Sequence, residues 1–309
     1  MTPPRVSLVV PVYNAGRYIA ETLDSLLAQR YPDLEIIVID DGSTDDSWAR
    51  IQRHAGRCRV FTQPNQGQAA TLNRGWALAS GTVLGYLSAD DTLEPDAVAQ
   101  VVQALESRPQ AVLAYPDYWL IDADSRRFRE VSAPDFDYAA VLLEGVCPPG
   151  PGMLFRREAF ARVGGWDPSL RQIPDYEFLL RIGLCGEGLH VAQRLASFRV
   201  HEQSQTFALA DAARVGEHGR VIAGFFARDD VPPAYRAARR QAQANAAILM
   251  SRGHLRAWRF GQALGCGMRA LAAHPGVLLR ARTWRLLANG LLGRALHYWR
   301  ARRGQQVRA

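Results

Sequence analysis

The sequence predicts an α/β protein in which helices flank a doubly wound, mostly parallel sheet, followed by a basic, α-helical C-terminal extension. Three observations carry this prediction. Strand and helix patterns alternate with short loops over the first hundred residues, the pattern is helical from about residue 211, and 48% of the 309 residues are hydrophobic. Such a chain can bury one large core or two modest ones, which excludes the disordered, collagenous and disulfide-scaffold classes.

Apolar runs that end in polar residues predict buried strands, and apolar residues three or four apart predict helices. Four strands are predicted in the first hundred residues, at Val6–Val12, Glu35–Asp40, Arg59–Thr62 and Thr82–Leu87. Helices are predicted after them, around Ile19–Leu27, Asp45–Ala55 and Ala69–Ala79 and, with Pro95 in its first turn, through Val98–Leu105. Because ligands bind beyond the carboxyl ends of the strands in such sheets, polar residues there are candidate site residues.

The middle of the chain, roughly residues 115–205, has a less regular pattern. The segment Val146–Met153 must be a loop, because its three prolines and two glycines allow neither a helix nor a central strand. Further helices are predicted at Arg157–Val163 and Tyr176–Leu184, a strand at His190–Val200, and breaks in the C-terminal helical pattern at Val231–Pro233 and His274–Gly276.

The formal charge divides the chain into an acidic body and a basic tail. Residues 1–230 contain all 30 acidic residues and carry a net charge of −8, whereas residues 231–309 contain 15 arginines and no acid. We therefore expect separate roles for the two parts. The four cysteines, which are too widely spaced for a disulfide framework and are expected to be reduced thiols, are Cys58, Cys147, Cys185 and Cys266.

The sequence has no pattern typical of a signal peptide or a membrane span. The apolar run after Arg5 is short and lacks a cleavage-like site. The longest charge-free stretch, Gly75–Ala89, is shorter than the roughly 20 residues that a spanning helix needs. We therefore expect a cytoplasmic protein.

Two pairs of adjacent acids follow predicted strands. Asp40 and Asp41 begin the sequence D-D-G-S-T-D, and Asp90 and Asp91 end the sequence S-A-D-D. Ser43–Asp45 can simply cap the next helix, but capping does not explain two adjacent carboxylates at each of two neighbouring strand ends. Crowded like charges cost free energy unless a cation compensates them, and carboxylate oxygens are the ligands that hard divalent cations prefer.

A third group of polar residues lies in the second half of the chain. Asp175 and Glu177 stand at the start of a predicted helix, where an acid is a routine choice. Glu177 also lies four residues before Arg181, so an ion pair on one helix face explains both equally well. His201 follows a predicted strand and can equally be a solvated histidine at the strand end.

The ordered series of motifs resembles the inverting family 2 glycosyltransferases of GT-A fold. The series runs P-V-Y-N, D-D-G-S-T-D, N-x-G, L-N-R-G, S-A-D-D, G-G-W-D, D-Y-E and R-V-H over roughly residues 5–205. Each motif alone is weak, whereas their order and spacing are specific. The resemblance implies a GT-A catalytic domain over 1–210, with a nucleotide-sugar-binding half at about 1–115 and an acceptor half at about 116–210, followed by an Arg-rich helical region over 211–309.

The resemblance further implies a transferase that uses a nucleotide sugar, UDP-linked. Pro11, Tyr13 and Asp41 match the positions that contact the base, and the ring of Tyr13 is available to stack on it. Asp40 is expected to hold the same loop, and Arg74 to lie near the nucleotide.

For the diphosphate, the resemblance implies a divalent cation, Mg²⁺ or Mn²⁺. Asp90 and Asp91 match the D-x-D region that holds the ribose and the metal. Arg199 and His201 match a strand-end pair that contacts the diphosphate or the metal. Asp175 matches the acid that acts as general base.

The chain departs from the family pattern in two places. Ser88 stands where many relatives have the first Asp of D-x-D, which leaves the number of metal ligands open. Tyr176 separates Asp175 from Glu177 where many relatives have two adjacent acids, so Glu177 is a rival for the base. In the implied mechanism the base removes a proton from an acceptor hydroxyl, and that oxygen attacks the anomeric carbon from the opposite face and inverts its configuration.

The basic tail lies outside this resemblance. Trp284, Leu287, Leu291, Ala295 and Tyr298 step by three or four residues and therefore share one helical face. We expect the tail to bind an anionic membrane surface, with arginines at lipid phosphates and aromatic rings at the interface. Packing of this face on the catalytic domain is the alternative. No nucleic-acid partner is expected, because the tail contains no recognisable binding module.

Together these inferences describe a cytoplasmic, membrane-peripheral enzyme that builds a surface or extracellular polysaccharide on a saccharide or lipid-linked saccharide acceptor. Two alternatives stay open, an inactive nucleotide-sugar-binding or scaffold protein and a sugar nucleotidyltransferase. A nucleotidyltransferase normally has a Gly-rich, Lys- or Arg-bearing phosphate loop after its first strand, and Pro11–Gly16 is not such a loop.

Overall fold

The computed structural model describes residues 3–201 and 209–306, with side chains described up to residue 293. Its contacts divide the chain into two units, which we call the sheet unit and the helical unit. The sheet unit comprises Met1–Asp137, Cys147–Ser169 and Pro174–Ser204, and the helical unit comprises Tyr138–Val146, Leu170–Ile173 and Gln205–Ala309. Two short segments from the predicted catalytic domain thus cluster with the C-terminal helices.

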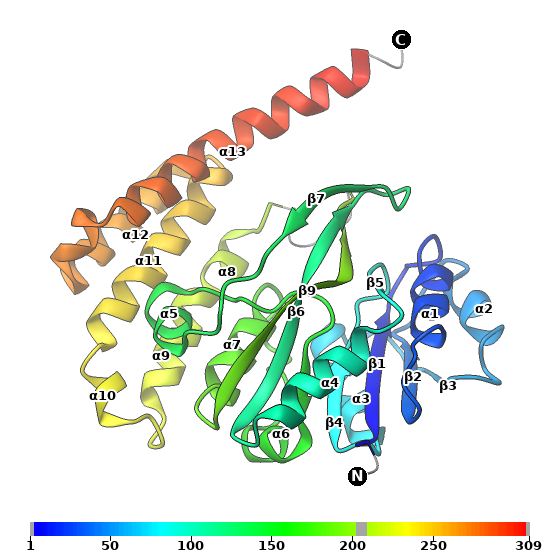
Figure 1. The fold of residues 1–309 in the computed structure, drawn as a ribbon. Helices are drawn as coiled ribbons and strands as arrows, with labels where there is room; N and C mark the ends of the chain where they lie inside the picture. The colour runs from blue at the N-terminus through cyan, green and yellow to red at the C-terminus, as the bar shows by residue number, and fades with distance from the viewer. Residues whose placement is uncertain (1–2, 202–208, 307–309) are drawn as a thin grey trace. The chain divides into compact units, whose positions relative to one another are not determined.

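The sheet unit is built on one nine-stranded sheet (Figure 1). Its strands are β1 (Val6–Val12), β2 (Leu34–Asp40), β3 (Arg59–Thr62), β4 (Val83–Tyr86), β5 (Thr92–Leu93), β6 (Ala111–Ile121), β7 (Arg127–Val131), β8 (Leu154–Arg156) and β9 (Glu187–Arg199). The spatial order is β3-β2-β1-β4-β8-β6-β9-β5, with β7 paired to β6. Its helices are α1 (Ile19–Leu27), α2 (Ser47–Gln52), α3 (Gln68–Leu78), α4 (Ala97–Ser107), α6 (Arg157–Val163) and α7 (Pro174–Ile182).

The strand directions confirm the predicted α/β architecture. Strands β3, β2, β1 and β4 are parallel neighbours, and β6 is parallel to β9. Strand β8 runs antiparallel to both β4 and β6 and joins these two parallel groups into one sheet. Because β2, β1 and β4 are parallel and adjacent, their carboxyl ends meet at one edge, where the polar motifs follow them.

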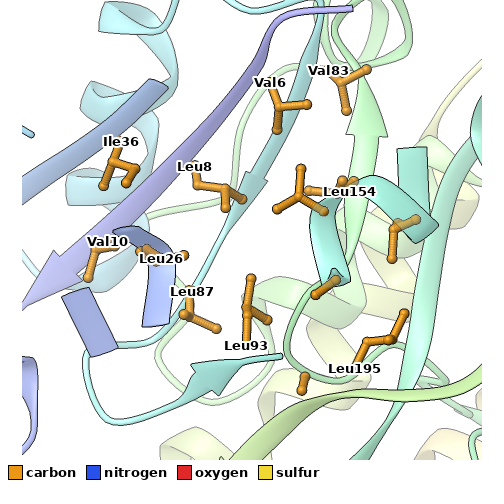
Figure 2. Close-up of a cluster of buried hydrophobic side chains, with 14 of the residues drawn as sticks. Val6, Leu8, Val10, Leu26, Ile36, Val83, Leu87, Leu93, Leu154 and Leu195 are labelled. Atoms are coloured by element: carbon orange, nitrogen blue, oxygen red, sulfur yellow. The ribbon is translucent and has the colours of Figure 1, made fainter. Parts of the chain in front are cut away.

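The core of the sheet unit explains the continuous apolar runs of its strands. All seven residues of β1 are buried, as expected of a parallel strand that is covered on both faces. Leu8 and Val10 of β1 belong to one buried cluster with Leu26 of α1 (Figure 2). Helix α3 approaches β1 so closely that a Cβ on Gly75 would lie 2.3 Å from a methyl carbon of Val9. A larger residue at this position would push the helix off the sheet.

Strand β6 is the main difference from the sequence prediction, which left residues near 115–121 irregular. The strand spans Ala111–Ile121 and lies between β8 and β9. A proline normally argues against a central strand, because it cannot donate to the ladder. Here the register between β6 and β9 shifts at Pro116 and again at Asp117. This irregularity absorbs the proline, and the pairing resumes on both sides of it.

The predicted elements of the first half are otherwise present. Strands β1 and β3 and helix α6 have the predicted bounds. Helix α2 is shorter than the predicted Asp45–Ala55, because Asp45 turns its carboxylate to the backbone N–H groups of Gly16 and Ser47 and stays outside the helix. Residues 146–153 form the predicted loop.

The helical unit is centred on the long helix α11. Its helices are α5 (Tyr138–Glu144), α8 (Ala212–Val215), α9 (Glu217–Ala227), α10 (Pro233–Arg236), α11 (Arg239–Arg256), α12 (Phe260–Ala273), the 3₁₀ helix η1 (Pro275–Leu279) and α13 (Ala281–Gln306). A small buried cluster includes Ala244 and Ile248 of α11, and Leu286 and Leu287 of α13 pack against it. None of the described helices has the length and apolarity that spanning a bilayer requires.

The residues expected to share one face of the last helix differ in their burial. Leu287 is partly buried against the cluster, whereas Trp284 is 58% exposed and Leu291 46% exposed. The indole N–H of Trp284 donates to the carbonyl of Leu278 at 2.7 Å. The side chains of Ala295 and Tyr298 lie outside the described residues.

Candidate functional site

The ends of β1 and β2 lie side by side and form the first part of the site. Val12 pairs with Asp40 in the sheet, and the backbone N–H of Asp41 donates to the carbonyl of Val12 at 2.7 Å. Pro11 is buried within β1, whereas Tyr13, the residue after the strand, is 53% exposed and presents an aromatic surface at the sheet edge.

The two carboxylates at the end of β2 have different surroundings. Oδ1 of Asp41 accepts hydrogen bonds from Nε2 of Gln63 (2.8 Å) and the backbone N–H of Gln66 (2.9 Å). Oδ2 of Asp41 accepts from the backbone N–H of Gly67 at 2.8 Å. Asp40 is also buried, but its Oδ1 has no hydrogen-bond partner among the described residues. Asp41 therefore holds the loop before α3, and Asp40 retains a buried acceptor atom.

Arg74 extends this arrangement from helix α3. Its guanidinium donates to Oε1 of Gln63 at 2.8 Å and to the carbonyl of Thr62 at 3.2 Å, and it lies over the ring of Phe61. Gln63 thus links Arg74 to Asp41. The sequence analysis did not identify Gln63, because a single glutamine after a strand has no distinctive pattern.

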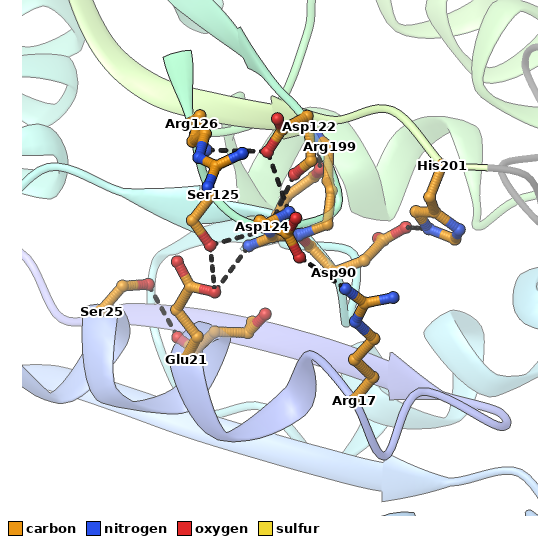
Figure 3. A network of polar contacts seen from close by, with 12 residues as sticks. Arg17, Glu21, Ser25, Asp90, Asp122, Asp124, Ser125, Arg126, Arg199 and His201 are labelled. Carbon is orange, nitrogen blue, oxygen red and sulfur yellow. Dashed lines mark hydrogen bonds and ion pairs between the residues drawn. The ribbon is translucent and has the colours of Figure 1, made fainter. Parts of the chain in front are cut away.

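Asp90 and His201 come together at the second acidic motif. Nε2 of His201 lies 2.8 Å from Oδ2 of Asp90 (Figure 3), and its ring packs against Tyr18 with the ring centroids 4.8 Å apart. Asp90 is partly exposed. A carboxylate and an imidazole at a strand end can hold a divalent cation whose remaining ligands are diphosphate oxygens and water. Within the described part of the chain, no cluster of three or more His, Cys, Asp or Glu is arranged to hold a metal.

The contact described for Asp91 is with the protein backbone, and the metal site that it was expected to share with Asp90 stays a prediction. Its carboxylate is buried, and Oδ1 accepts the backbone N–H of Arg199 at 2.9 Å. Burial, and after it the neighbouring charge of Asp90, raises the pKa of Asp91 well above its usual range. Asp91 thus ties the loop after β4 to the end of β9.

Arg199 also serves the fold of this loop, where a contact to the diphosphate or metal was expected. Its side chain is fully buried and donates to the carbonyl of Asp90 at 2.7 Å and to the carboxylate of Glu21 at 2.7 Å (Figure 3). It also donates to the carbonyl of Asp122 and to Oγ of Ser125. With these donors directed at protein acceptors, Arg199 positions the backbone of Asp90, and the expected contact to the diphosphate or metal stays a prediction.

Asp175 and Glu177, the two candidate bases, are separated by their contacts. Both oxygens of Glu177 pair with Arg181 at 2.6 Å, and Arg181 in turn donates to carbonyls of the loop Val163–Gly165. Among the described residues, Oδ1 of Asp175 accepts the local backbone N–H of Tyr176, at 2.8 Å. Burial raises the pKa of Asp175 above its usual range, and the backbone hydrogen bonds offset only part of that rise.

Two further residues connect the motifs. Tyr86, the last residue of β4, has a pKa raised well above its usual value, first by burial and then by charges that include Asp175 and Asp91. Asn73 of α3 exchanges two hydrogen bonds with the backbone of Trp166, at 2.7 and 2.8 Å. No sequence pattern pointed to Tyr86, whereas Asn73 belongs to the L-N-R-G motif, in which only Arg74 had an expected role.

Comparison with protein families places this constellation among known enzymes. The family described as glycosyl transferase family 2 matches residues 7–164 of the chain. An uncharacterized glycosyltransferase of Nostoc sp. is 30% identical over 67% of this chain and 68% of its own length. The O-antigen biosynthesis protein RfbC of Myxococcus xanthus is 36% identical over 58% of this chain, and the match covers only 14% of that protein. Escherichia coli chondroitin synthase is 29% identical over 61% of this chain and 28% of its own length.

Solved structures share the fold at low sequence identity. TarS of S. aureus (residues 1–349), in complex with UDP-GlcNAc, has a TM-score of 0.63 and 13% identity over 89% of this chain and 92% of its own. The mannosyltransferase PcManGT of Pyrobaculum calidifontis, in complex with GDP-Man and Mn²⁺, has a TM-score of 0.60 and 20% identity over 95% of this chain and 86% of its own. These likenesses establish the GT-A fold of the chain.

Proposed function

This chain belongs to glycosyl transferase family 2 and is a glycosyltransferase, and from that premise we propose that it moves a sugar from a UDP-sugar to a hydroxyl of a saccharide or lipid-linked saccharide. The observation that carries this proposal is that the carboxylates of the motif acids differ in their contacts. Asp41 and Glu177 accept hydrogen bonds from protein donors at both oxygens. Oδ1 of Asp40 has no partner among the described residues, and the contacts described for Asp90 and Asp175 each engage a single carboxylate oxygen. The nucleotide sugars bound in the two structural neighbours and the polysaccharide names of several relatives support a role in polysaccharide synthesis.

In the donor site we propose that Asp40, not Asp41, recognises the base. The partnerless Oδ1 of Asp40 is a buried acceptor, and leaving it without a donor costs free energy. The N3–H of uracil is a donor that would satisfy it, whereas a cytosine ring has no such N–H. The exposed ring of Tyr13 is available to stack on the base.

For the diphosphate we propose that Asp90 and His201 hold Mg²⁺ or Mn²⁺. The cation supplies charge neutralisation of the leaving nucleoside diphosphate when it is bound. The role of the chain is to keep the Asp90 carboxylate at the end of β4. Arg199 holds this residue by donating to the backbone carbonyl of Asp90. His201 holds it through Nε2, which lies 2.8 Å from Oδ2 of the Asp90 carboxylate.

For the chemistry we propose Asp175 as the general base and an inverting displacement. A carboxylate with a raised pKa is a stronger base than one in water, and it needs only hydrogen-bond reach to the acceptor hydroxyl. The acceptor oxygen then attacks the anomeric carbon from the face opposite the diphosphate. Glu177 is held by two hydrogen bonds to Arg181, which supports the assignment of Asp175 over its rival.

We further propose that the enzyme acts at the inner face of the plasma membrane, in synthesis of the cell envelope. Phe260, Leu264 and Met268 repeat every four residues along α12 and are each more than half exposed. Residues 231–309, which contain this helix, carry 15 arginines and no acid. An exposed apolar stripe within a strongly basic region is complementary to an anionic lipid surface.

The donor proposal is tested by thermal unfolding with UDP, CDP and GDP, with and without Mn²⁺. UDP with Mn²⁺ should raise the Tm most, because a ligand that binds only the folded state stabilises it by mass action. Asp40→Asn should remove the preference for UDP over CDP. An unchanged preference would overturn the role of Asp40, and no shift with any nucleotide would overturn the donor site.

Turnover separates the enzyme from an inactive nucleotide-sugar-binding protein. Release of UDP from UDP-sugars is measured with and without added saccharide acceptors. Acceptor-dependent release is expected. A protein that binds UDP-sugars but releases no UDP with any acceptor would favour the inactive alternative.

A further inference from the structure

The helical unit contains a cavity lined by arginine side chains. It has a volume of about 180 Å³ and lies between α8, α9, α11 and the segment Leu170–Ile173, all within this unit. Arg214, Arg252 and Arg256 line it, and none of its described lining residues is acidic. None of the proposed donor-site residues belongs to this unit.

Arg252 places a positive charge without a described acidic partner at this cavity. It lies one helical turn from Arg256 on α11, so two like charges share one helix face. Its Nε is buried and has no hydrogen-bond partner among the described residues. Burial lowers the pKa of Arg252, and the nearby charges of Arg256 and Arg282 lower it further. A cation in this position is destabilising unless an anion compensates it.

The two buried arginines of the described chain show how such a charge is normally compensated. Arg199 is paired with Glu21, and Arg181 with Glu177. At the cavity, Nε of Arg214 lies 3.6 Å from Asp211, and the buried carboxylate of Glu217 accepts hydrogen bonds from the backbone N–H groups of Gln172 and Ile173 in the wall. Among the described residues, neither acid forms an ion pair with Arg252 or Arg256. The local positive charge at Arg252 and Arg256 is therefore available to an anion from outside the chain.

The chemistry of the walls defines the anion further. A planar guanidinium can form bidentate hydrogen bonds to two oxygens of a phosphoryl group. Two neighbouring guanidiniums can neutralise the two negative charges of that group. The remaining wall includes Ile173, Val215 and Leu249, which are apolar. The cavity can hold a phosphoryl group and the first few atoms of an organic substituent.

We propose that this cavity is a binding site for a phosphoryl group, held by Arg252 and Arg256. The group comes either from a soluble phosphate ester or from the phosphate of a lipid-linked acceptor. The second source rests on the proposed function. It is suggested by the chain itself, because Ile173 in the cavity wall stands two residues before Asp175. Binding of the phosphoryl group does not depend on that function.

The first experiment measures thermal unfolding of the full chain with pyrophosphate and inorganic phosphate, in EDTA and at ionic strength fixed with NaCl. Saturating anion should raise the Tm by on the order of 5 °C. Arg252→Gln should weaken the binding at least about tenfold. The matched control is Arg240→Gln, which removes an exposed charge from the other end of α11 and should retain the full shift.

Arg252→Met gives a second, independent readout. It keeps the long apolar stem and removes the uncompensated charge, so without anion it should melt at or above the wild-type temperature while losing the response to phosphate. If Arg252→Gln fails to fold, this variant and Arg256→Gln carry the test. An anion shift that is absent in the wild type, or equal in the wild type and the Arg252 variants, would overturn the site.

Two ligands distinguish the sources of the phosphoryl group. A hexose 1-phosphate tests the soluble source, and a short polyprenyl monophosphate in detergent micelles tests the lipid source. Stronger stabilisation by the polyprenyl phosphate, lost in Arg252→Met, assigns the lipid-linked acceptor. The response of Arg252→Met to UDP and Mn²⁺ should be unchanged. A protein that binds phosphate through Arg252 but shows no UDP response would refute the proposed donor site and leave this site standing.

Discussion

At the scale of single residues, the site is organised by which polar atoms are already used. Adjacent acids in one motif have opposite roles, as Asp40 and Asp41 show. Asp41 accepts three hydrogen bonds from its own chain, whereas Asp40 keeps a buried oxygen without a partner among the described residues. Asp90 and Asp91 are divided in the same way, since only Asp91 is consumed by a buried backbone contact. The two acids of each pair are adjacent in the same motif, so the sequence does not distinguish their roles. Only their contacts in the folded chain do.

The role of Asp175 gives a prediction about rate and pH. Asp175→Asn should lower kcat/KM about 10²- to 10⁴-fold, because a positioned general base contributes that much, while UDP binding is retained. In the wild type, kcat/KM should fall as the pH is lowered through the pKa of Asp175, at a pH above the usual carboxyl range, because burial raises that pKa. Initial rates of sugar transfer between pH 4 and pH 9 measure both the loss of kcat/KM in the variant and the pH dependence of the wild type.

Glu177→Gln is the control for this prediction. Its carboxylate bonds only Arg181 in the described structure, so the variant should lose stability and keep most of its turnover where it is folded. A fully active Asp175→Asn together with an inactive, folded Glu177→Gln would move the base to Glu177.

His190 gives a prediction about stability and pH. Burial alone would lower its pKa, but the hydrogen bonds that the imidazole donates to the carboxylates of Asp117 (2.7 Å) and Asp135 (3.0 Å) outweigh burial and raise it. Because the pKa is raised in the folded protein, the protonated histidine adds its full stability below its unfolded pKa of about 6.5, and this is lost as pH rises through the folded pKa. His190→Gln should cost about 1–2 kcal/mol at pH 6 and less at pH 9. Denaturant unfolding at both pH values tests this, and a cost independent of pH would contradict it.

At the scale of elements, side chains of one element hold the loops of another. Asn73 on α3 fixes the loop before Asp167 by two hydrogen bonds to the backbone of Trp166. Gly165 is required beside it, because a Cβ there would lie 2.1 Å from Oδ1 of Asn73. Arg181 on α7 holds the other side of the same loop through its carbonyls. The G-G-W-D motif is thus a structural connection between α3 and α7.

Removal of the α3 contact should be costly. Asn73→Ala leaves the backbone N–H and carbonyl of Trp166 without these partners and should lower the free energy of unfolding by about 2–3 kcal/mol. Urea unfolding measures the difference. Gln68→Ala, at an exposed position of the same helix, should change the stability by less than about 0.5 kcal/mol. Equal effects of the two substitutions would show that the contact contributes nothing specific.

At the scale of the whole molecule, charge and exposed apolar surface are distributed unevenly. The acidic residues all precede position 231, and the basic remainder includes α12 with its exposed Phe260, Leu264 and Met268. Association with lipid would bury this stripe and bring arginines to anionic headgroups. The two contributions respond differently to salt, because screening weakens only the electrostatic one.

This distribution predicts selective binding to anionic vesicles. In a flotation assay the full chain should bind vesicles that contain phosphatidylglycerol and leave neutral phosphatidylcholine vesicles unbound, with weaker binding at 0.5 M salt than at 0.1 M. Replacement of both Phe260 and Leu264 by Ser should reduce binding several-fold. Phe128→Ser, an exposed apolar residue of the sheet unit, is the control and should bind as the wild type. Failure to bind anionic vesicles would exclude the membrane proposal.

The sequence by itself determined the elements whose apolar pattern is continuous, and it determined the family. Strand β1 and helix α6 have their predicted bounds because their patterns reflect local burial, and the order of the motifs gave the resemblance that the family match confirms. It did not predict β6, because Pro116 interrupts the pattern, and only the register shifts against β9 allow a central strand there.

Only the tertiary structure decided which members of the motifs are bound by other groups of the chain. Asp91 and Arg199 bind each other across 108 residues of sequence, and Glu177 is paired while Asp175 is not. The arginine cavity likewise joins residues that are far apart in the chain. The amino-acid sequence shows which side chains follow each strand. Whether an oxygen or a guanidinium still needs a partner depends on groups that folding brings from distant segments.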